Sequence, residues 1–129
     1  MKIIVWIVQV LLALAFLMAG LTKALNPLDG LAVAMPWVGD VPPGLVRFTG
    51  VAELVAAVGL ILPAVTRIRP GLVPLAASGL ALVMVLATVF HASRGEMGDA
   101  TRTGSLLVVA FFVAWSRWKI VPIQPRAKA

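Results

Sequence analysis

The sequence predicts an all-α fold, an antiparallel bundle of four transmembrane helices. Hydrophobic residues make up 61% of the 129 residues and charged residues only 12%, against about 45–50% and about 25% in an ordinary soluble domain. A soluble domain of this size could not hide so much apolar surface, because small domains bury only about 60–70% of what their unfolded chains expose. Four long apolar runs follow one another along the chain, with Lys and Arg residues near their ends. We therefore expect a single integral membrane domain in a lipid bilayer.

Each apolar run is close to the roughly 20 residues that a helix needs to cross a bilayer. The first run follows Lys2 and exceeds the core of a signal peptide, about 7–15 residues, so we expect it to remain as a helix. A segment rich in proline and glycine follows it, and we expect a loop that lies on or dips into the membrane surface. The predicted helices span residues 3–25, 45–65, 70–92 and 103–118, and residues 119–129 form a basic tail.

The Lys and Arg residues are divided unequally between the two ends of the predicted bundle. With four spans, both termini and the turn between the second and third helices lie at one end, which carries seven Lys and Arg residues and no acidic residue. The other end carries four Lys and Arg residues and all five acidic residues. This asymmetry predicts a multi-pass protein of a bacterial-type cytoplasmic membrane with both termini in the cytoplasm.

The composition also excludes several kinds of site. The net charge is +6, but the basic residues do not form a stripe with aromatic stacking platforms, so no nucleic-acid partner is expected. The chain has no cysteine, which excludes thiol nucleophiles, disulfides and Cys-ligated metal centres. With a single histidine, no protein-only metal site is expected.

Chain direction places several ionisable residues at one outward end of the bundle. Glu53 lies about two turns inside its predicted helix, and an ionisable group at mid-membrane costs on the order of 2.5–3.5 kcal/mol, so it normally faces protein or water. Gly50 and Ala57 share its face, and small residues are typical of close helix contacts. Lys23 and His91 stand near the ends of the first and third helices. We expect an outward-opening polar pocket lined by Lys23, Glu53 and His91, the candidate catalytic residues.

Structural roles stay open for all three. Glu53 could serve only as an ion-pair partner of Lys23 or Arg47, Lys23 could extend to the membrane interface, and His91 could cap helix carbonyls. Four further residues at this end are expected to contact a bound ligand, although Trp37 also suits an interfacial aromatic belt; they are Arg47, Arg94, Trp37 and Thr103.

Four stretches of the sequence resemble a known family. They are FLMAGLTKAL (16–25), MPWVGDVPPGLVRFTGVAELVAAVGLILP (35–63), HASRGE (91–96) and VAWSR (113–117). Together they make the chain similar to the DoxX-like family of small four-helix membrane proteins. Founding members of that family are membrane subunits of a quinone-reducing thiosulfate oxidoreductase, and other members are associated with redox or thiol-stress complexes. The resemblance implies a four-helix bundle, a quinone-like ligand and functional interest in Lys23, Glu53 and His91.

Three functions remain open at this point. The first is a redox-associated protein that binds a quinone-like lipophilic molecule and receives electrons from a membrane or extracytoplasmic partner. The second is a membrane acid–base enzyme, an isomerase or hydrolase of an apolar lipid-like substrate. The third is a non-catalytic subunit of a membrane complex. A small multidrug exporter fits less well, because those exporters carry their key carboxylate in the first helix. The oligomeric state is open, a homo-oligomer included.

Overall fold

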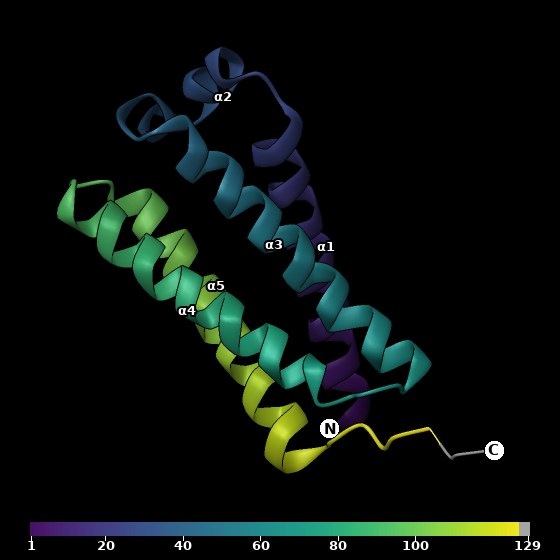
Figure 1. Cartoon of the computed structure of the whole chain (residues 1–129). Helices are drawn as coiled ribbons and strands as arrows, with labels where there is room; N and C mark the ends of the chain where they lie inside the picture. Colours follow the sequence, from purple (N-terminus) through teal and green to yellow (C-terminus); the bar gives the residue numbers. More distant parts are fainter. Residues whose placement is uncertain (127–129) are drawn as a thin grey trace.

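The computed structural model describes residues 1–126 and contains only helices and connecting segments within them, which confirms the predicted all-α fold. The last three residues of the predicted tail lie outside the described part, Lys128 among them. The elements, shown in Figure 1, are α1 (Lys2–Leu25), α2 (Leu28–Ala34), η1 (Pro36–Asp40), α3 (Pro43–Thr66), α4 (Leu72–Ser93), α5 (Met97–Trp115) and η2 (Ser116–Ile120).

Four of these helices are long and apolar enough to cross a membrane: α1, α3, α4, and α5 continued by η2. Large apolar side chains remain exposed along them, such as Ile3, Met18 and Phe48, each at least 70% exposed. So continuous an apolar surface is not tolerated in water, whereas lipid chains cover it at no cost. The protein is therefore a multi-pass integral membrane protein.

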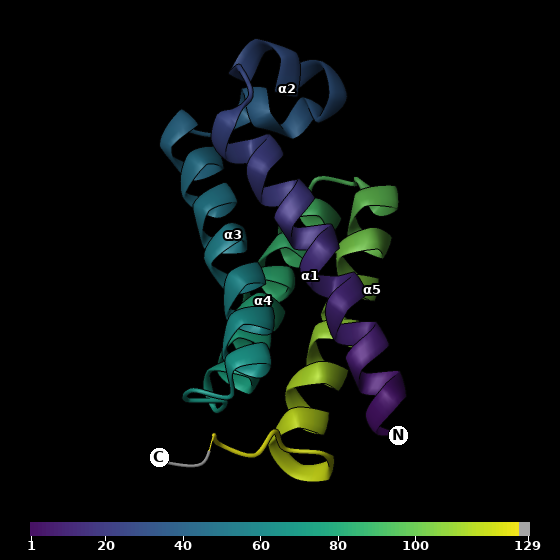
Figure 2. The ribbon, with the colours of Figure 1, turned by 90° about the vertical axis from the view of Figure 1, so that its right-hand side faces the viewer.

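The long helices are arranged as two antiparallel pairs. α1 packs along α3, and α4 packs along α5, while contacts between the two pairs are fewer (Figures 1 and 2). One end of the bundle carries α2 and η1, and we call it the outer end. The opposite end carries Met1 and the C-terminal segment, and we call it the terminal end. Between the pairs lies an apolar core that includes Phe16, Leu60, Leu80 and Val113.

The two largest differences from the sequence-based prediction lie before the second and fourth spans. The segment predicted as a loop after the first helix contains α2 and η1, whose apolar side chains pack around Leu31 and Val38. The fourth span begins at Met97 rather than at Thr103. Its first turns are polar and precede the apolar part of the helix, so no apolar run indicated them. Asp99 in the first turn suits a helix N-terminus, where a negative charge is favourable.

Two glycines set the close approach of α1 and α3. A Cβ atom added to Gly20 would lie 2.8 Å from the carbonyl oxygen of Gly50, and one added to Gly50 would lie 2.7 Å from the backbone nitrogen of Ala24. Both neighbours are backbone atoms that cannot move aside alone. The two helices therefore touch through their main chains, and this contact lies within one turn of both Lys23 and Glu53 in sequence.

We expect Gly50→Ala to destabilise the protein by about 1–3 kcal/mol, because the added methyl group forces α1 and α3 apart. Gly79→Ala is the matched control, since a Cβ atom there meets nothing within 4 Å. The control is expected to be neutral or to stabilise α4 by up to about 1 kcal/mol. Unfolding in detergent, followed by circular dichroism, measures both. Equal stability of the two variants would contradict the close contact.

Candidate functional site

The crossing of α1 and α3 brings Lys23 and Glu53 together at the outer end. The Lys23 Nζ atom donates a hydrogen bond to Glu53 Oε1 at 2.7 Å. The side chain of Glu53 is 1% exposed and that of Lys23 is 15% exposed. The sequence-based prediction that these two groups meet inside the bundle is therefore confirmed as geometry. Their functional role stays a prediction.

The second carboxylate oxygen of Glu53, Oε2, is buried and has no hydrogen-bond partner among the described residues 1–126. A buried polar atom without a partner normally costs on the order of 1–3 kcal/mol, and native proteins contain only a few such atoms. Glu53 also lines a pocket of about 400 Å³. We call this cavity the Lys23–Glu53 pocket.

The Lys23–Glu53 pocket lies between the two helix pairs. α1 supplies one wall and α5 the other, with Glu53 of α3 and Met84 of α4 between them and Met35 from the segment that joins α2 to η1. Most of the lining is apolar; the polar members are Thr22, Lys23, Glu53, Arg102 and Thr103. The pocket thus combines apolar walls with a few polar groups, as ligand sites usually do, and its volume falls in the usual range of about 300–1,000 Å³.

Small residues open the pocket toward the surface of the bundle. Ala15 is exposed and Ala19 half-buried on the α1 side, and Arg102 is exposed on the α5 side. α1 and α5 share few contacts, and the pocket lies between them.

The other predicted ligand residues have structural contacts. Arg47 Nη1 donates to the backbone oxygens of Lys23 and Asn26, at 2.9 and 2.7 Å, and so caps the end of α1. Thr103 does line the pocket, and its hydroxyl lies 2.9 Å from that of Thr88. Of the pocket contacts predicted for Arg47 and Thr103, the structure supports only that of Thr103.

His91 is not among the residues that line the Lys23–Glu53 pocket, so the predicted cluster of three residues is wrong and only Lys23 and Glu53 meet there. Its Nδ1 atom lies 2.9 Å from Glu96 Oε1, and its ring packs edge-on against Trp37 and Phe90. His91 stands near the end of α4, on the face toward η1 and the loop before α5. Trp37 shares this environment and is likewise absent from the pocket lining.

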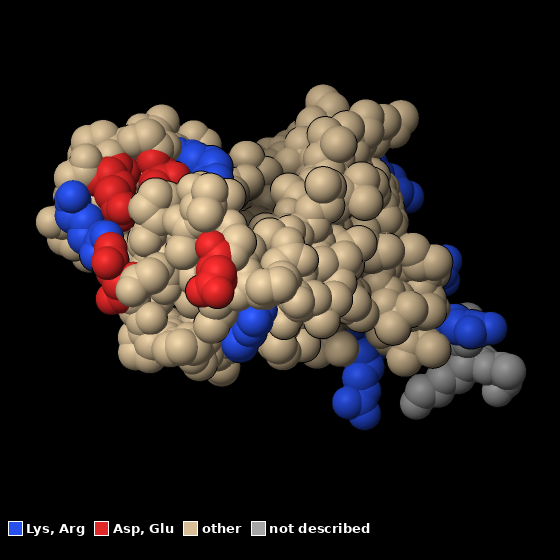
Figure 3. Space-filling model, turned by 90° about the horizontal axis from the view of Figure 1, so that it is seen from above, with Lys and Arg blue, Asp and Glu red and all other residues tan. Residues whose placement is uncertain are grey.

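Arg94 connects the two outer loops instead of contacting the pocket. It forms ion pairs with Asp40 of η1 and with Glu96, and thereby links the segment before α3 to the loop before α5. Hydrogen bonds from His91 and then Arg94 hold the pKa of the Glu96 carboxyl below its usual value. Viewed from this end, the acidic side chains gather beside Lys and Arg on one face (Figure 3).

The same cluster has ligand atoms suited to a metal ion. His91 Nδ1 and one carboxylate oxygen each of Glu96 and Asp99 lie within 4.8 Å of one another. Such a donor set suits zinc, but Arg94 and Arg102 already lie beside the two carboxylates. The expectation of no metal site stays a prediction.

Several lining residues were not predicted from the sequence, and Arg102 and Met35 are the two with the clearest reasons. Arg102 lines it because α5 begins before this residue, and it also lies 3.5 Å from Asp99. Met35 lines it because α2 and η1 turn back over the bundle. The polar run 96–102 was the only sequence signal for Arg102, and nothing in the sequence pattern indicated Met35.

Four membrane-spanning helices around a buried Lys–Glu pair define a small polytopic membrane protein with a pocket between its two helix pairs. Residues 7–115 match the DoxX-like family. The chain therefore belongs to the DoxX-like family, as its sequence resemblance predicts. Comparison with curated proteins gives no match, and comparison with solved structures gives none.

Proposed function

We propose that this protein binds the head group of a quinone-like lipophilic molecule in the Lys23–Glu53 pocket, in support of a redox partner. One observation carries the proposal: a buried lysine–carboxylate pair, with one carboxylate oxygen unpaired, stands in a largely apolar pocket of about 400 Å³. A quinone has an apolar ring with two carbonyl oxygens. The ring suits the apolar walls of the pocket, and a carbonyl oxygen suits the polar groups at one side of it.

The Lys23 ammonium group is the donor for a quinone carbonyl. An ammonium has three N–H bonds, and one of them is used by Glu53. The remaining donors are available to an oxygen bound in the pocket, with Thr103 as a further polar neighbour. Hydrogen bonds from a charged donor are roughly twice as strong as neutral ones. This contact fixes which end of the ligand faces the protein.

Glu53 is the proton carrier in this proposal. Reduction of a quinone to a quinol consumes two electrons and two protons. The electrons come from an oxidoreductase partner in the membrane or outside it, since the chain has no thiol and no evident redox group. Glu53 is the one acidic side chain among the described residues that line the pocket. It takes up a proton from water at the outer end and passes it to one reduced oxygen as a general acid, while the other oxygen takes its proton from water.

A titration of the purified protein with a short-chain ubiquinone tests this proposal. Bound ligand raises the unfolding free energy by about 2.7 kcal/mol at a concentration one hundred times the Kd. We expect the quinone to raise the melting temperature in detergent, and an alkylbenzene of the same size to leave it unchanged. Equal shifts of the melting temperature with both compounds would mean that the pocket takes up apolar molecules without specificity, and this would contradict the proposal.

The alternative of an acid–base enzyme requires three groups in one pocket, and the structure brings only two of them together. His91 lies outside the pocket, so the imidazole is not available beside Lys23 and Glu53. The reading as a non-catalytic subunit is compatible with the same bundle but gives no reason for an unpaired, buried carboxylate oxygen. The geometry therefore favours the quinone-binding function of the three.

We also propose that the terminal end faces the cytoplasm, on the Lys and Arg asymmetry of the sequence. Single cysteines at Gly39 and at Ile68 would each be the sole thiol, since the chain has no cysteine. Both sites have room: a Cβ atom at Gly39 meets only Ala32, at 4.0 Å, and Ile68 is 55% exposed. We expect an impermeant maleimide to label Gly39→Cys in intact cells and Ile68→Cys only after lysis. Labelling of Ile68→Cys from outside would contradict this orientation.

A further inference from the structure

A second polar group is buried at the terminal end, far from the Lys23–Glu53 pocket. Arg117 lies in η2, a short π-helical turn that continues α5, and it is only 3% exposed. π-helical turns are rare and often occur at functional sites. The sequence places Arg117 at the end of an apolar run, where an arginine usually reaches into solvent. Its burial is therefore a finding that needs a physical reason.

The guanidinium group is held in one orientation by three neighbours. Nε donates to Gln9 Oε1 at 2.7 Å, and Nη1 donates to the backbone oxygen of Val121 at 3.0 Å. The Arg117 Cζ atom also lies 4.8 Å from the centre of the Trp6 ring. The remaining terminal nitrogen, Nη2, is buried and has no partner among residues 1–126. The group is thus fixed in place with one donor left over.

No acidic side chain balances this buried charge. The five acidic residues of the chain all lie toward the outer end, and the ion pairs found within residues 1–126 do not include Arg117. The terminal end instead carries further Lys and Arg residues, namely Lys2, Arg67, Arg69, Lys119 and Arg126. An unpaired buried charge is strongly unfavourable. An anionic ligand would satisfy both the charge and the free donor.

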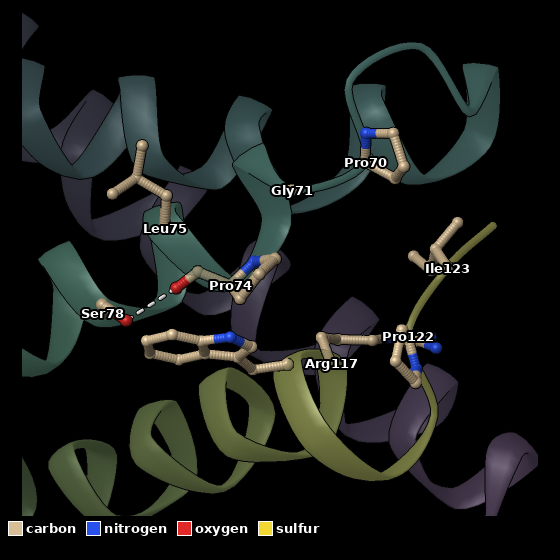
Figure 4. A pocket seen from close by; sticks show the side chains of 9 residues that line it. Pro70, Gly71, Pro74, Leu75, Ser78, Arg117, Pro122 and Ile123 are labelled. Atoms are coloured by element: carbon tan, nitrogen blue, oxygen red, sulfur yellow. Dashed lines mark hydrogen bonds between the residues drawn. The ribbon is translucent and has the colours of Figure 1, made fainter. Parts of the chain in front are cut away.

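Arg117 lines a pocket of about 400 Å³ at this end. Pro70, Gly71 and Pro74 form the side of the pocket that belongs to the start of α4. Arg117 comes from η2 on the opposite side and extends toward Pro122 (Figure 4). The start of a helix adds partial positive charge to the same space. Apart from Arg117 and the hydroxyl of Ser78, the lining side chains are apolar or aromatic.

We propose that this cavity, which we call the Arg117 pocket, binds the phosphate group of an anionic phospholipid. Arginine is well suited to phosphate, because its planar N–H groups match the phosphate oxygens. The surrounding apolar and proline side chains suit the glycerol and the first part of the acyl chains. A phosphate oxygen accepts the hydrogen bond that Nη2 of Arg117 does not otherwise make, and its charge neutralises the guanidinium.

The depth of the pocket supports a lipid as the source of the phosphate. Trp115 and Trp118 are exposed at the same end, at 49% and 64%. Exposed tryptophans gather at the level of the lipid head groups. The Arg117 pocket is part of the same last turns and therefore lies at head-group depth. A soluble anion would need neither the apolar walls nor this position.

Native mass spectrometry of the delipidated protein tests the proposal. The probes are phosphatidylglycerol, diacylglycerol and inorganic phosphate. We expect phosphatidylglycerol to bind and diacylglycerol not to bind, with inorganic phosphate at least tenfold weaker because it lacks the apolar contacts. Arg117→Gln should lower the affinity for phosphatidylglycerol by about tenfold or more, which is the usual contribution of one hydrogen bond to a charged group. If inorganic phosphate bound as tightly as phosphatidylglycerol, the pocket would be an anion site and the proposal of a lipid ligand would be refuted.

Two further variants separate the site from general effects of charge and folding. Gly71→Trp fills the pocket while leaving Arg117 in place, and a Cβ atom at Gly71 meets nothing within 4 Å. This variant should fold and lose phosphatidylglycerol binding by at least about tenfold, as Arg117→Gln does. Lys119→Gln removes the same charge at the same end, yet Lys119 is exposed and outside the pocket lining. Unchanged binding in Gly71→Trp, or an equal loss in Lys119→Gln, would overturn the proposal.

Discussion

Replacing Lys23 with methionine is expected to lower the free energy of unfolding by roughly 3–5 kcal/mol, the usual cost of leaving one partner of a buried ion pair alone. The reason is Glu53, whose side chain is 1% exposed and whose Oε1 atom has Lys23 as its hydrogen-bond donor. Methionine keeps the length and apolar stem of lysine, so packing against α3 changes little. Chemical unfolding in detergent micelles measures the loss.

The double variant Lys23→Met with Glu53→Gln supplies the control for this prediction. Glutamine carries no charge, so the double variant leaves no unpaired charge in the pocket. We expect it to recover most of the stability lost by Lys23→Met, because replacing a whole buried pair is often nearly neutral. A double variant no more stable than Lys23→Met would show that the loss comes from packing rather than from the stranded carboxylate.

Under the proposed quinone-binding function, Glu53→Gln alone is expected to suppress quinone reduction by roughly 10²–10⁴-fold, the usual contribution of a positioned general acid or base. Glutamine keeps the size and hydrogen-bonding capacity of glutamate but cannot pass a proton. The measurement is the part of the quinone-reduction rate in isolated membranes that depends on this protein. Binding of the quinone should change much less than the rate, since the Lys23 donor remains.

Glu96→Gln is the matched control for the loss of activity. Glu96 is also a carboxylate at the outer end, but it contacts His91 and Arg94 and does not line the Lys23–Glu53 pocket. We expect this variant to keep most of the activity. An equal loss in Glu96→Gln, or full activity in Glu53→Gln with intact binding, would remove the proton-carrying role from Glu53.

The four spans could be predicted from the sequence because apolar length alone determines which segments cross a bilayer. The short helices α2 and η1 could not, since proline and glycine in that segment indicate a loop. Their helical form depends on tertiary packing of Leu31 and Val38 against their neighbours. The start of α5 could not be predicted either, because its first turns are polar and no apolar run marks them.

The pairing of Lys23 with Glu53 could also be predicted, because chain direction fixes which helix ends lie together. The position of His91 could not, since direction gives the level of a residue along the bundle and not the side of the helix that it occupies. Likewise, Gln9 was visible only as an interruption of the first span. Its contact with Arg117 joins two residues that are 108 positions apart, and no local pattern records such a contact.

Covalent photolabelling tests the proposed binding of a quinone head group in the Lys23–Glu53 pocket. A photoreactive quinone is added to the protein in lipid, and the labelled peptides are identified by mass spectrometry. We predict labels within residues 15–23 and 102–106, which line the pocket from α1 and α5. Excess unlabelled quinone should abolish them, and so should Ala19→Phe, which fills the pocket. Labels that fall instead on the lipid-facing groove around Val58 and Leu62, unaffected by Ala19→Phe, would contradict the claim.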